Sequence, residues 1–198
     1  TVQYGLRADQ NNTANAFSIQ TIRFANGTIW EWDDIRRQPF HPVDGQLSSL
    51  SFAEGVNLVG NAGNNTLHGS NFDDTIHGGA GNDHLQGYNG DDTYLFGRGD
   101  GHDIILEVET REDRRNIVKL LGLTAQDTEI CMPHAGRHYD DLIIRIRDTG
   151  ETLTVRNGLC SRYGNADNSF SIQAVEFADG TVWEWSDILG QPIHFLSD

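Results

Sequence analysis

Four nine-residue units follow one another without a gap over residues 60–95. Their sequences are GNAGNNTLH, GSNFDDTIH, GGAGNDHLQ and GYNGDDTYL. Each unit begins with Gly, has Asn or Asp at its sixth place and has an apolar residue at its eighth. A strict period of this kind is typical of repeat architectures, in which each unit stacks on its neighbours.

The period predicts a coil of short strands joined by tight turns. Glycine reaches backbone conformations that strain other residues, so each Gly-rich stretch can turn and present its carbonyl groups. We expect two units per coil, with strands alternating between two sheets and turns eighteen residues apart stacked together. Carbonyl and carboxylate oxygens then converge, and no His or Cys stands at places one to six of any unit. That donor set suits calcium rather than zinc.

The units resemble the RTX (repeats-in-toxin, haemolysin-type) calcium-binding nonapeptide, whose pattern is GGxGxDxUx. The third unit fits it fully, and the others depart at Asn65, Ser70, Phe72 and Tyr88. A Gly/Asp-rich linker would not keep a nine-residue register with an apolar eighth place. The resemblance implies an all-β fold built on a calcium-bound parallel β-roll.

The resemblance also implies the ligands. In the family, one repeat supplies the carbonyls of places two and four and its sixth-place side chain. The repeat eighteen residues on supplies the carbonyls of places one and three and its own sixth-place side chain. The first site then comprises Asn61, Gly63, Asn65, Gly78, Ala80 and Asp83. The second comprises Ser70, Phe72, Asp74, Gly87, Asn89 and Asp92.

Two further sites are implied near the end of the repeats. A third combines Gly79, Gly81 and Asp83 with the 97–103 loop, where Gly97, Gly99, Asp100 and Asp103 are the candidates. The register stretches by two residues there, so Asp100 and Gly99 remain alternatives. A fourth site at Tyr88, Gly90 and Asp92 would need Glu107 or Glu109. We therefore expect two to four calcium ions.

The charge of the chain agrees with cation binding. The formal net charge is −15, and residues 54–113 hold 12 acidic and 2 basic residues. Such a segment repels itself unless cations neutralise it, and nucleic acid is excluded as a partner. The sequence contains no apolar run long enough for a membrane span and no recognisable signal peptide.

A longer repeat flanks the nonapeptides. Residues 17–32 recur as residues 170–185, an offset of 153, so the chain resembles one period of a tandem array with the tail of the preceding period. We divide it into an N-terminal cap at 1–50, a roll at 51–105 and a β-rich C-terminal cap at 106–198. Residues 51–59 resemble a degenerate first coil, with Leu58 in the apolar place and Val56 where an acid belongs.

The flanking segments predict hairpins and short helical turns at both ends of the roll. Each long copy alternates like a strand on either side of an Asn-Gly or Asp-Gly turn, and Asp33 and Ser186 are candidate helix N-caps. Further strands are predicted at 116–121, 129–132, 142–147 and 152–156. The sequences TYLFGRGDGHDII, DLIIRI, ETLTVRNG and IQAVEFADGTVW resemble the segment that follows RTX repeats in large secreted proteins. Such caps would cover the open ends of the roll.

Other residue types give no catalytic pattern. His68, His77, His84 and His102 show no catalytic spacing, and we expect structural roles for them. The Trp pairs, Trp30 with Trp32 and Trp183 with Trp185, fit the inner face of a hairpin better than a sugar-binding surface. Cys131 and Cys160 have no metal spacing, and free thiols are favoured over a single bridge.

Three functions follow from this sequence. The first is a non-enzymatic, calcium-binding structural module of a large secreted bacterial adhesin or toxin, exported by type I secretion machinery and folding on calcium binding outside the cell. The second is the carrier module of a secreted protease or lipase. The third is a glycan-binding module. We expect an extracellular or cell-surface location, with any host or cell-surface target bound through other domains of the parent.

Overall fold

The computed structural model describes residues 21–24, 27–31, 34, 38–39, 41, 46–47, 54–106, 114–133, 141–156, 158 and 171–195. The chain divides into two compact units, residues 1–39 and residues 40–198. The predicted division at residues 50 and 105 remains an interpretation of the sequence. Within residues 40–198, both sheets run without interruption from the repeats into the C-terminal strands.

The N-terminal unit contains the predicted hairpin. Strands β1 (Thr21–Arg23) and β2 (Ile29–Glu31) pair antiparallel. The turn uses Gly27 at φ +88°, which glycine adopts without strain, and the Phe24 N–H donates to the Thr28 carbonyl at 2.9 Å. The Trp30 ring packs edge-on against Phe24, with 4.8 Å between ring centroids. Trp32 and Asp33 lie outside the described residues.

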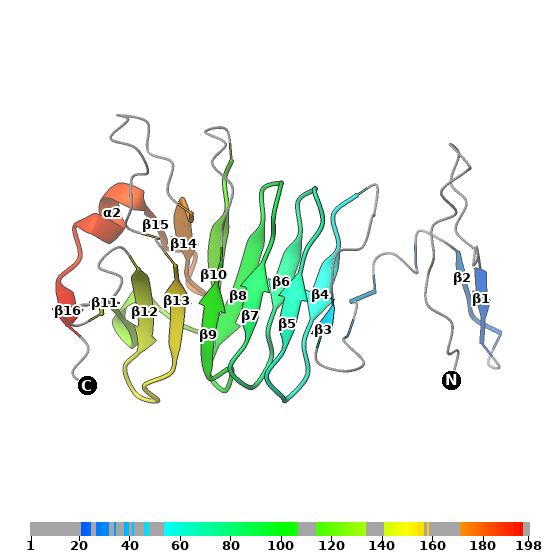
Figure 1. Cartoon of the computed structure of the whole chain (residues 1–198), viewed down its shortest axis with the longest axis horizontal. Coiled ribbons are helices and arrows are strands. Elements are labelled where there is room, and N and C mark those ends of the chain that lie inside the picture. Colours follow the sequence, from blue (N-terminus) through cyan, green and yellow to red (C-terminus); the bar gives the residue numbers. More distant parts are fainter. Residues whose placement is uncertain are drawn as a thin grey trace. The chain divides into compact units, whose positions relative to one another are not determined.

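The second unit begins with the roll, drawn in cyan and green in Figure 1. Its strands are β3 (Gln46–Leu47), β4 (Asn57–Val59), β5 (Thr66–His68), β6 (Thr75–His77), β7 (His84–Gln86), β8 (Thr93–Gly97) and β9 (His102–Ile105). Even-numbered strands lie in one sheet and odd-numbered strands in the other. All neighbouring pairs within the roll are parallel. The predicted parallel β-roll is therefore confirmed.

The eighth-place residues build the core between the two sheets. In one sheet Leu58, Ile76 and Tyr94 are register partners, and in the other Leu67 pairs with Leu85. All five are fully buried. Strands of three residues suffice because only the middle side chain points inward, and the flanking Thr, His and Gln residues remain partly or fully exposed. Leu58 thus takes the apolar place predicted for it, and of the predicted degenerate coil the structure describes residues 54–59.

The C-terminal strands extend both sheets of the roll. They are β10 (Ile117–Leu121), β11 (Thr128–Met132), β12 (Leu142–Ile146), β13 (Thr152–Val155), β14 (Ala174–Glu176), β15 (Val182–Glu184) and β16 (Ile193–Phe195), with a 3₁₀ turn η1 (Ala125–Asp127) and helix α2 (Trp185–Leu189). The sheet orders are β15-β14-β10-β8-β6-β4 and β16-β11-β12-β13-β9-β7-β5-β3. The predicted C-terminal cap of antiparallel strands and short helical turns is thus present (Figure 1).

Two local predictions need correction. Ser186 is not the N-cap of the final helix, because α2 already begins at Trp185 and its N-cap is Glu184, whose N–H donates to Asp187 Oδ2 at 3.0 Å. Trp185 consequently belongs to the helix rather than to the strand that carries Trp183. Both Trp side chains pack against the core, and Trp183 lies edge-on to Phe177 with 4.6 Å between ring centroids. The predicted packing role of this pair is confirmed.

Candidate calcium sites in the turns of the roll

The sixth-place residues form a ladder of hydrogen bonds between successive coils. The N–H of Val56 donates to Asp74 Oδ1 and that of Asn65 to Asp83 Oδ1, each at 2.7 Å. The N–H of Asp74 donates to Asp92 Oδ1 and that of Asp83 to Asp103 Oδ1, each at 2.9 Å. The first three bonds span 18 residues and the last spans 20, which confirms the predicted stacking and the stretched register.

The turns fall into two classes by backbone conformation. Residues 60–77 contain no residue with positive φ. In the later turns the second and fourth places both have positive φ: Gly79 and Gly81, Tyr88 and Gly90, Gly99 and Gly101. Asn61, Ser70 and Phe72 stand where the pattern has Gly and lie in turns of the first class, whereas Tyr88 replaces Gly and still has a positive φ.

The first two turns are closed by their own sixth-place side chains. The Asn61 N–H donates to Asn65 Oδ1 at 2.7 Å, and the Ser70 N–H donates to Asp74 Oδ2 at 2.5 Å. The Ser70 hydroxyl lies 3.0 Å from Asp74 Oδ1. These two sixth-place side chains therefore already have protein donors.

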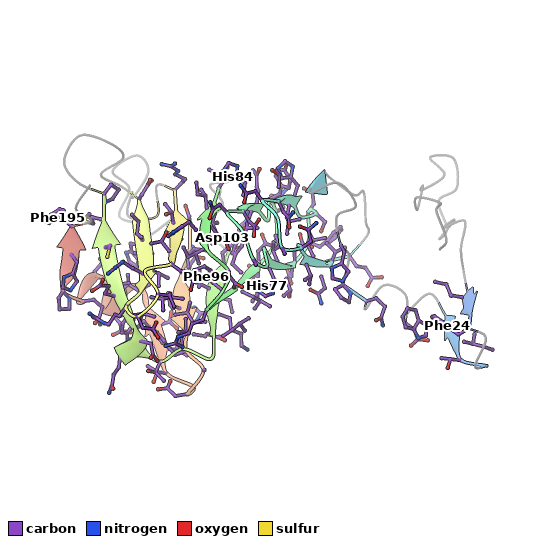
Figure 2. All side chains as sticks on the ribbon, turned by 90° about the horizontal axis from the view of Figure 1, so that it is seen from below. Phe24, His77, His84, Phe96, Asp103 and Phe195 are labelled. Atoms are coloured by element: carbon purple, nitrogen blue, oxygen red, sulfur yellow. The ribbon has the colours of Figure 1, made fainter. Side chains whose placement is uncertain are left out.

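The third turn differs from the first two in the hydrogen bonding of its sixth-place residue, Asp83. Its Oδ2 is buried without a hydrogen-bond donor, and so is Oδ2 of Asp103 one coil on. Asp103 lies in β9, where the roll meets the C-terminal strands (Figure 2). A buried, unpaired carboxylate is strongly destabilising, so such a group either takes up a proton or binds a cation. Both oxygens therefore fit a calcium ion.

The pKa values of the buried carboxyl groups also favour a bound cation. Burial raises the pKa of Asp103 to about 8, and the nearby carboxylates of Asp83 and Asp100 add to that rise. Burial likewise raises the pKa values of Asp83 and Asp74. In each case burial disfavours the charged form of the carboxyl group. A divalent cation would favour the ionised form of all three.

Backbone carbonyl groups complete the donor set. The described residues contain no cluster of three or more His, Cys, Asp or Glu side chains that could hold a metal, so carboxylates alone cannot form the sites. Each fourth-place carbonyl lies close to the fourth-place glycine one coil on. A Cβ added to that glycine would lie 2.8 Å from the oxygen of Gly63, 2.5 Å from that of Phe72 and 2.0 Å from that of Gly81. Carbonyl and carboxylate oxygens are the ligands that calcium takes.

The predicted ligand residues lie in turns that stack on one another. Asn61 and Gly63 face Gly79 and Gly81, and Gly78 and Gly87 lie against the carboxylates of Asp83 and Asp92 in their own units. Ala80 and Asn89 occupy the third places of stacked turns. The ligand sets themselves remain predictions carried over from the family.

The third predicted site is more sharply defined by the structure. A bridge pairs Gly81 with Gly101, and the Gly81 N–H donates to the Asp100 carbonyl at 3.0 Å. This register puts Asp100 at place three and Arg98 at place one, so Gly97 is displaced from the position expected for it. The Gly97 N–H instead donates to Asp100 Oδ2 at 2.7 Å. Sequence reasoning missed Arg98 because the two-residue insertion hides its place in the repeat.

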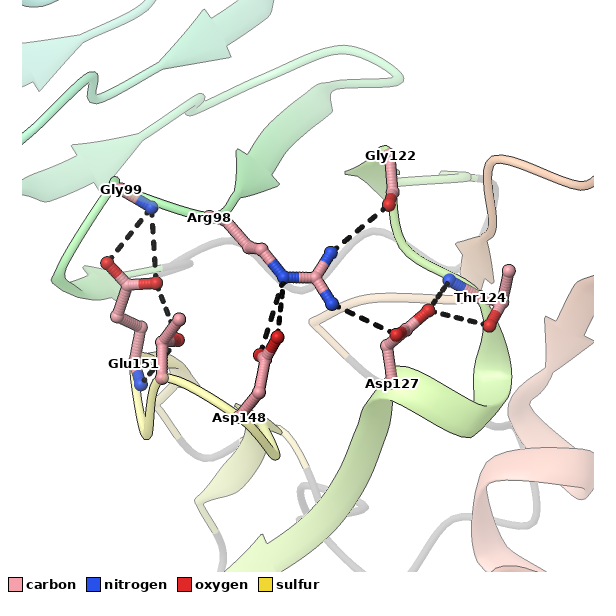
Figure 3. A network of polar contacts seen from close by, with 8 residues as sticks. Arg98, Gly99, Gly122, Thr124, Asp127, Asp148 and Glu151 are labelled. Carbon is pink, nitrogen blue, oxygen red and sulfur yellow. Dashed lines mark hydrogen bonds and ion pairs between the residues drawn. The ribbon is translucent and has the colours of Figure 1, made fainter.

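The last turn on this side is closed by charged side chains of the cap (Figure 3). The Glu151 carboxylate accepts the N–H groups of Gly99 and Gly101 at distances of 3.0–3.3 Å. Arg98 donates to Asp148 Oδ2 at 3.0 Å and to Asp127 Oδ1 at 2.9 Å, and so links this turn to two turns of the cap. The pKa of Asp127 is lowered to about 2, chiefly by hydrogen bonds from Thr124 and then by Arg98.

The described histidines take part in local contacts. His77 Nε2 lies 3.0 Å from Asp100 Oδ2, and this hydrogen bond raises the pKa of His77. His68 Nδ1 lies 3.2 Å from the Tyr88 hydroxyl, and His102 Nδ1 lies 3.0 Å from Thr152 Oγ1. Cys131 is a buried free thiol, and Cys160 lies outside the described residues.

Comparisons with protein families agree with this geometry. Residues 57–71 and 68–105 match the RTX calcium-binding nonapeptide repeat. The roll is an RTX repeat module. Residues 141–187 match the haemolysin-type calcium binding protein related domain. This second match confirms the resemblance of the C-terminal segment and covers β12 to α2. A comparison with curated proteins gives no significant match.

The RTX repeat identifies calcium as the ion that this module binds. When bound, calcium supplies positive charge and flexible coordination by six to eight oxygens. Asp83 and Asp103 would hold it through their buried Oδ2 atoms, and neighbouring carbonyl groups would supply further oxygens. Within the described residues, no helix has the length and apolarity of a membrane span.

Proposed function

We propose that the chain is a non-catalytic structural module of a large secreted bacterial protein, an adhesin or a toxin, that folds when it meets calcium outside the cell. One observation carries the proposal: Asp83 and Asp103 are stacked in adjacent coils, and each keeps a buried carboxylate oxygen without a donor. A cation bound by these oxygens would therefore stabilise the folded roll. Export by type I secretion machinery and an extracellular location accompany this proposal.

The energetics are consistent with a calcium switch. Residues 54–113 hold 12 acidic and 2 basic residues, and their mutual repulsion opposes folding when no metal is bound. An ion that binds only the folded state stabilises it by about 2.7 kcal/mol per site at a hundredfold excess over the dissociation constant. Extracellular calcium modules bind at about 0.1–1 mM. The roll should therefore be unfolded at cytosolic calcium concentrations and folded outside.

Circular dichroism tests this proposal directly. The calcium-free protein should have little strand signal, and calcium at millimolar concentration should produce it cooperatively. Potassium chloride at matched ionic strength controls for simple charge screening, which acts on all exposed charges alike. A strand signal that is the same with chelator and with calcium would contradict the proposal.

The carrier module of a secreted enzyme is the second proposal, and it rests on the same sites. The two differ only in the domains that accompany the module in its parent protein. In the described part of the chain, Trp183 and Trp185 pack against the core, which does not favour glycan binding by this pair.

A further inference from the structure

The roll ends differently on the side of the six-stranded sheet. There, residues 114–116 continue the stacking beyond the last nonapeptide. The Arg115 N–H donates to Asp91 Oδ1 at 2.8 Å, just as the Asp91 N–H donates to Asp73 Oδ1 at 2.9 Å. Asn116 Oδ1 accepts the Asp92 N–H at 2.8 Å. These contacts put residues 114, 115 and 116 at places four, five and six of one more coil.

This final coil differs from the earlier ones in the charges of its side chains. Each previous coil offers a carboxylate to the N–H one coil before it, at Asp74, Asp83, Asp92 and Asp103. Here the neutral amide of Asn116 takes that place. The fourth place holds Arg114, whereas the other stacked turns have Gly or Phe there. At the sixth place this coil therefore lacks a negative charge, and at the fourth place it carries a positive one.

The Arg114 side chain enters the preceding turn and binds oxygen atoms there. Its Nη1 donates to the carbonyl oxygen of Tyr88, and its Nη2 donates to Oδ1 of Asn89. Tyr88 is the one non-glycine residue with positive φ in the described parts of the chain, at +70°. Such a conformation is strained for a residue other than glycine and needs support from its surroundings. The guanidinium group holds the carbonyl group of this strained residue.

Tyr88 is also where a fourth calcium ion is implied by the sequence, in the turn that ends at the fully buried Asp92. Arg is always charged, and its planar fork of N–H donors suits two oxygen acceptors at once. We propose that the guanidinium group of Arg114 is a built-in cation that replaces calcium in this last turn. The inference rests on the proposed calcium-dependent function and limits the roll to at most three ions.

Ion stoichiometry measured by native mass spectrometry of the whole chain tests this inference. Arg114→Asp removes the built-in cation and supplies a carboxylate, so this variant should bind one more calcium ion than the wild type. Arg114→Lys keeps a positive charge and should keep the wild-type count. Arg115→Asp is the matched control, because the Arg115 side chain is 51% exposed and pairs with Glu184 at 2.7 Å, away from the Tyr88 carbonyl. Its count should not change.

The outcomes separate the inference from the proposed function. An equal ion count for Arg114→Asp and the wild type, with ions bound to both, would overturn the inference alone. Absence of calcium from every variant would overturn the proposed function and the inference together. If Arg114→Asp does not fold, Arg114→Gln gives a second test. Its calcium midpoint for folding should be higher than that of the wild type, since the fixed charge is lost, and an unchanged midpoint would contradict the inference.

Discussion

The backbone N–H of Asp83 donates to Oδ1 of Asp103 at 2.9 Å, while Oδ2 of both residues is buried without a donor. One oxygen of Asp103 thus fixes the register between coils, and the other is left for a cation. Asp83 has the same division of roles, because its Oδ1 accepts the Asn65 N–H at 2.7 Å. The same two carboxylates therefore connect the stacking of the coils with the binding of a cation.

The raised pKa values predict how the calcium-free protein responds to pH. The pKa of Asp103 is about 8 when folded, against 3.8 as its ordinary value. A carboxyl group with a raised folded pKa stabilises the folded state fully at low pH, and that contribution is lost as pH rises from about 4 to about 8. The calcium-free roll should therefore retain more strand signal at pH 5 than at pH 8.5. Asp103→Asn, which mimics the protonated form, should flatten this dependence.

Calcium should reverse that pH dependence, because it binds the ionised carboxylates and competes with protons. Titration calorimetry at pH 7 in two buffers of different ionisation enthalpy would detect the protons released. A calcium-free roll that becomes more stable as pH rises would contradict the assignment of buried, unpaired carboxylates.

Close approach of the turns predicts unequal effects of two glycine substitutions. Gly101 and Gly99 have φ of +90° and +94°, so Ala is strained at both. A Cβ at Gly101 would lie 2.0 Å from the Gly81 carbonyl oxygen, whereas a Cβ at Gly99 would meet nothing within 4 Å. Gly99→Ala should cost about 1–2 kcal/mol from strain alone. Gly101→Ala should cost at least about 2 kcal/mol more.

Urea unfolding of both Gly variants in saturating calcium would measure the difference. Since the backbone strain is common to both, Gly99→Ala is the matched control. Equal losses of stability would mean that the coils do not stack as closely as the structure has them.

The nature of the ligands predicts selectivity between cations. Magnesium requires near-ideal octahedral geometry and retains water, whereas calcium accepts six to eight oxygens at flexible distances. Sites built from backbone carbonyls and shared carboxylates should therefore favour calcium. Calcium should fold the protein at a concentration at least about tenfold lower than magnesium does, a difference of about 1.4 kcal/mol. Equal midpoints in circular dichroism titrations with the two salts would contradict the ligand assignment.

Much of the roll could be predicted from sequence because its period repeats both the turn and the inward-facing residue. Leu58 keeps its place even in a coil without the acid, since the eighth-place side chain packs in the core whichever residue holds the sixth place. Strand β3 escaped prediction because Gln46–Leu47 lies in a Pro-containing connection with no repeat of its own. It forms by pairing with β5, which a sequence pattern does not show.

The end coils were beyond prediction for a related reason. Asn116 takes its place 24 residues after Asp92, so counting by eighteen does not find it. Neither Arg98 nor Arg114 fits the nonapeptide pattern, and their positions depend on hydrogen bonds that the folded coils provide. The nonapeptide pattern also does not show the backbone conformation that separates the closed turns at Asn65 and Asp74 from the open turn at Asp83.

The central claim is that Asp83 serves two calcium sites, one with Asn65 and one with Asp103, through the buried Oδ2 atom that has no hydrogen-bond donor. Ion stoichiometry by titration calorimetry, with Asp83→Ala compared against Asn65→Ala, tests it most directly. Asn65 lies in one site only and supplies a neutral amide oxygen that already accepts the Asn61 N–H at 2.7 Å. The account predicts that Asp83→Ala loses two ions and sharply raises the calcium midpoint for folding, while Asn65→Ala loses at most one. Equal ion losses in the two variants would contradict it.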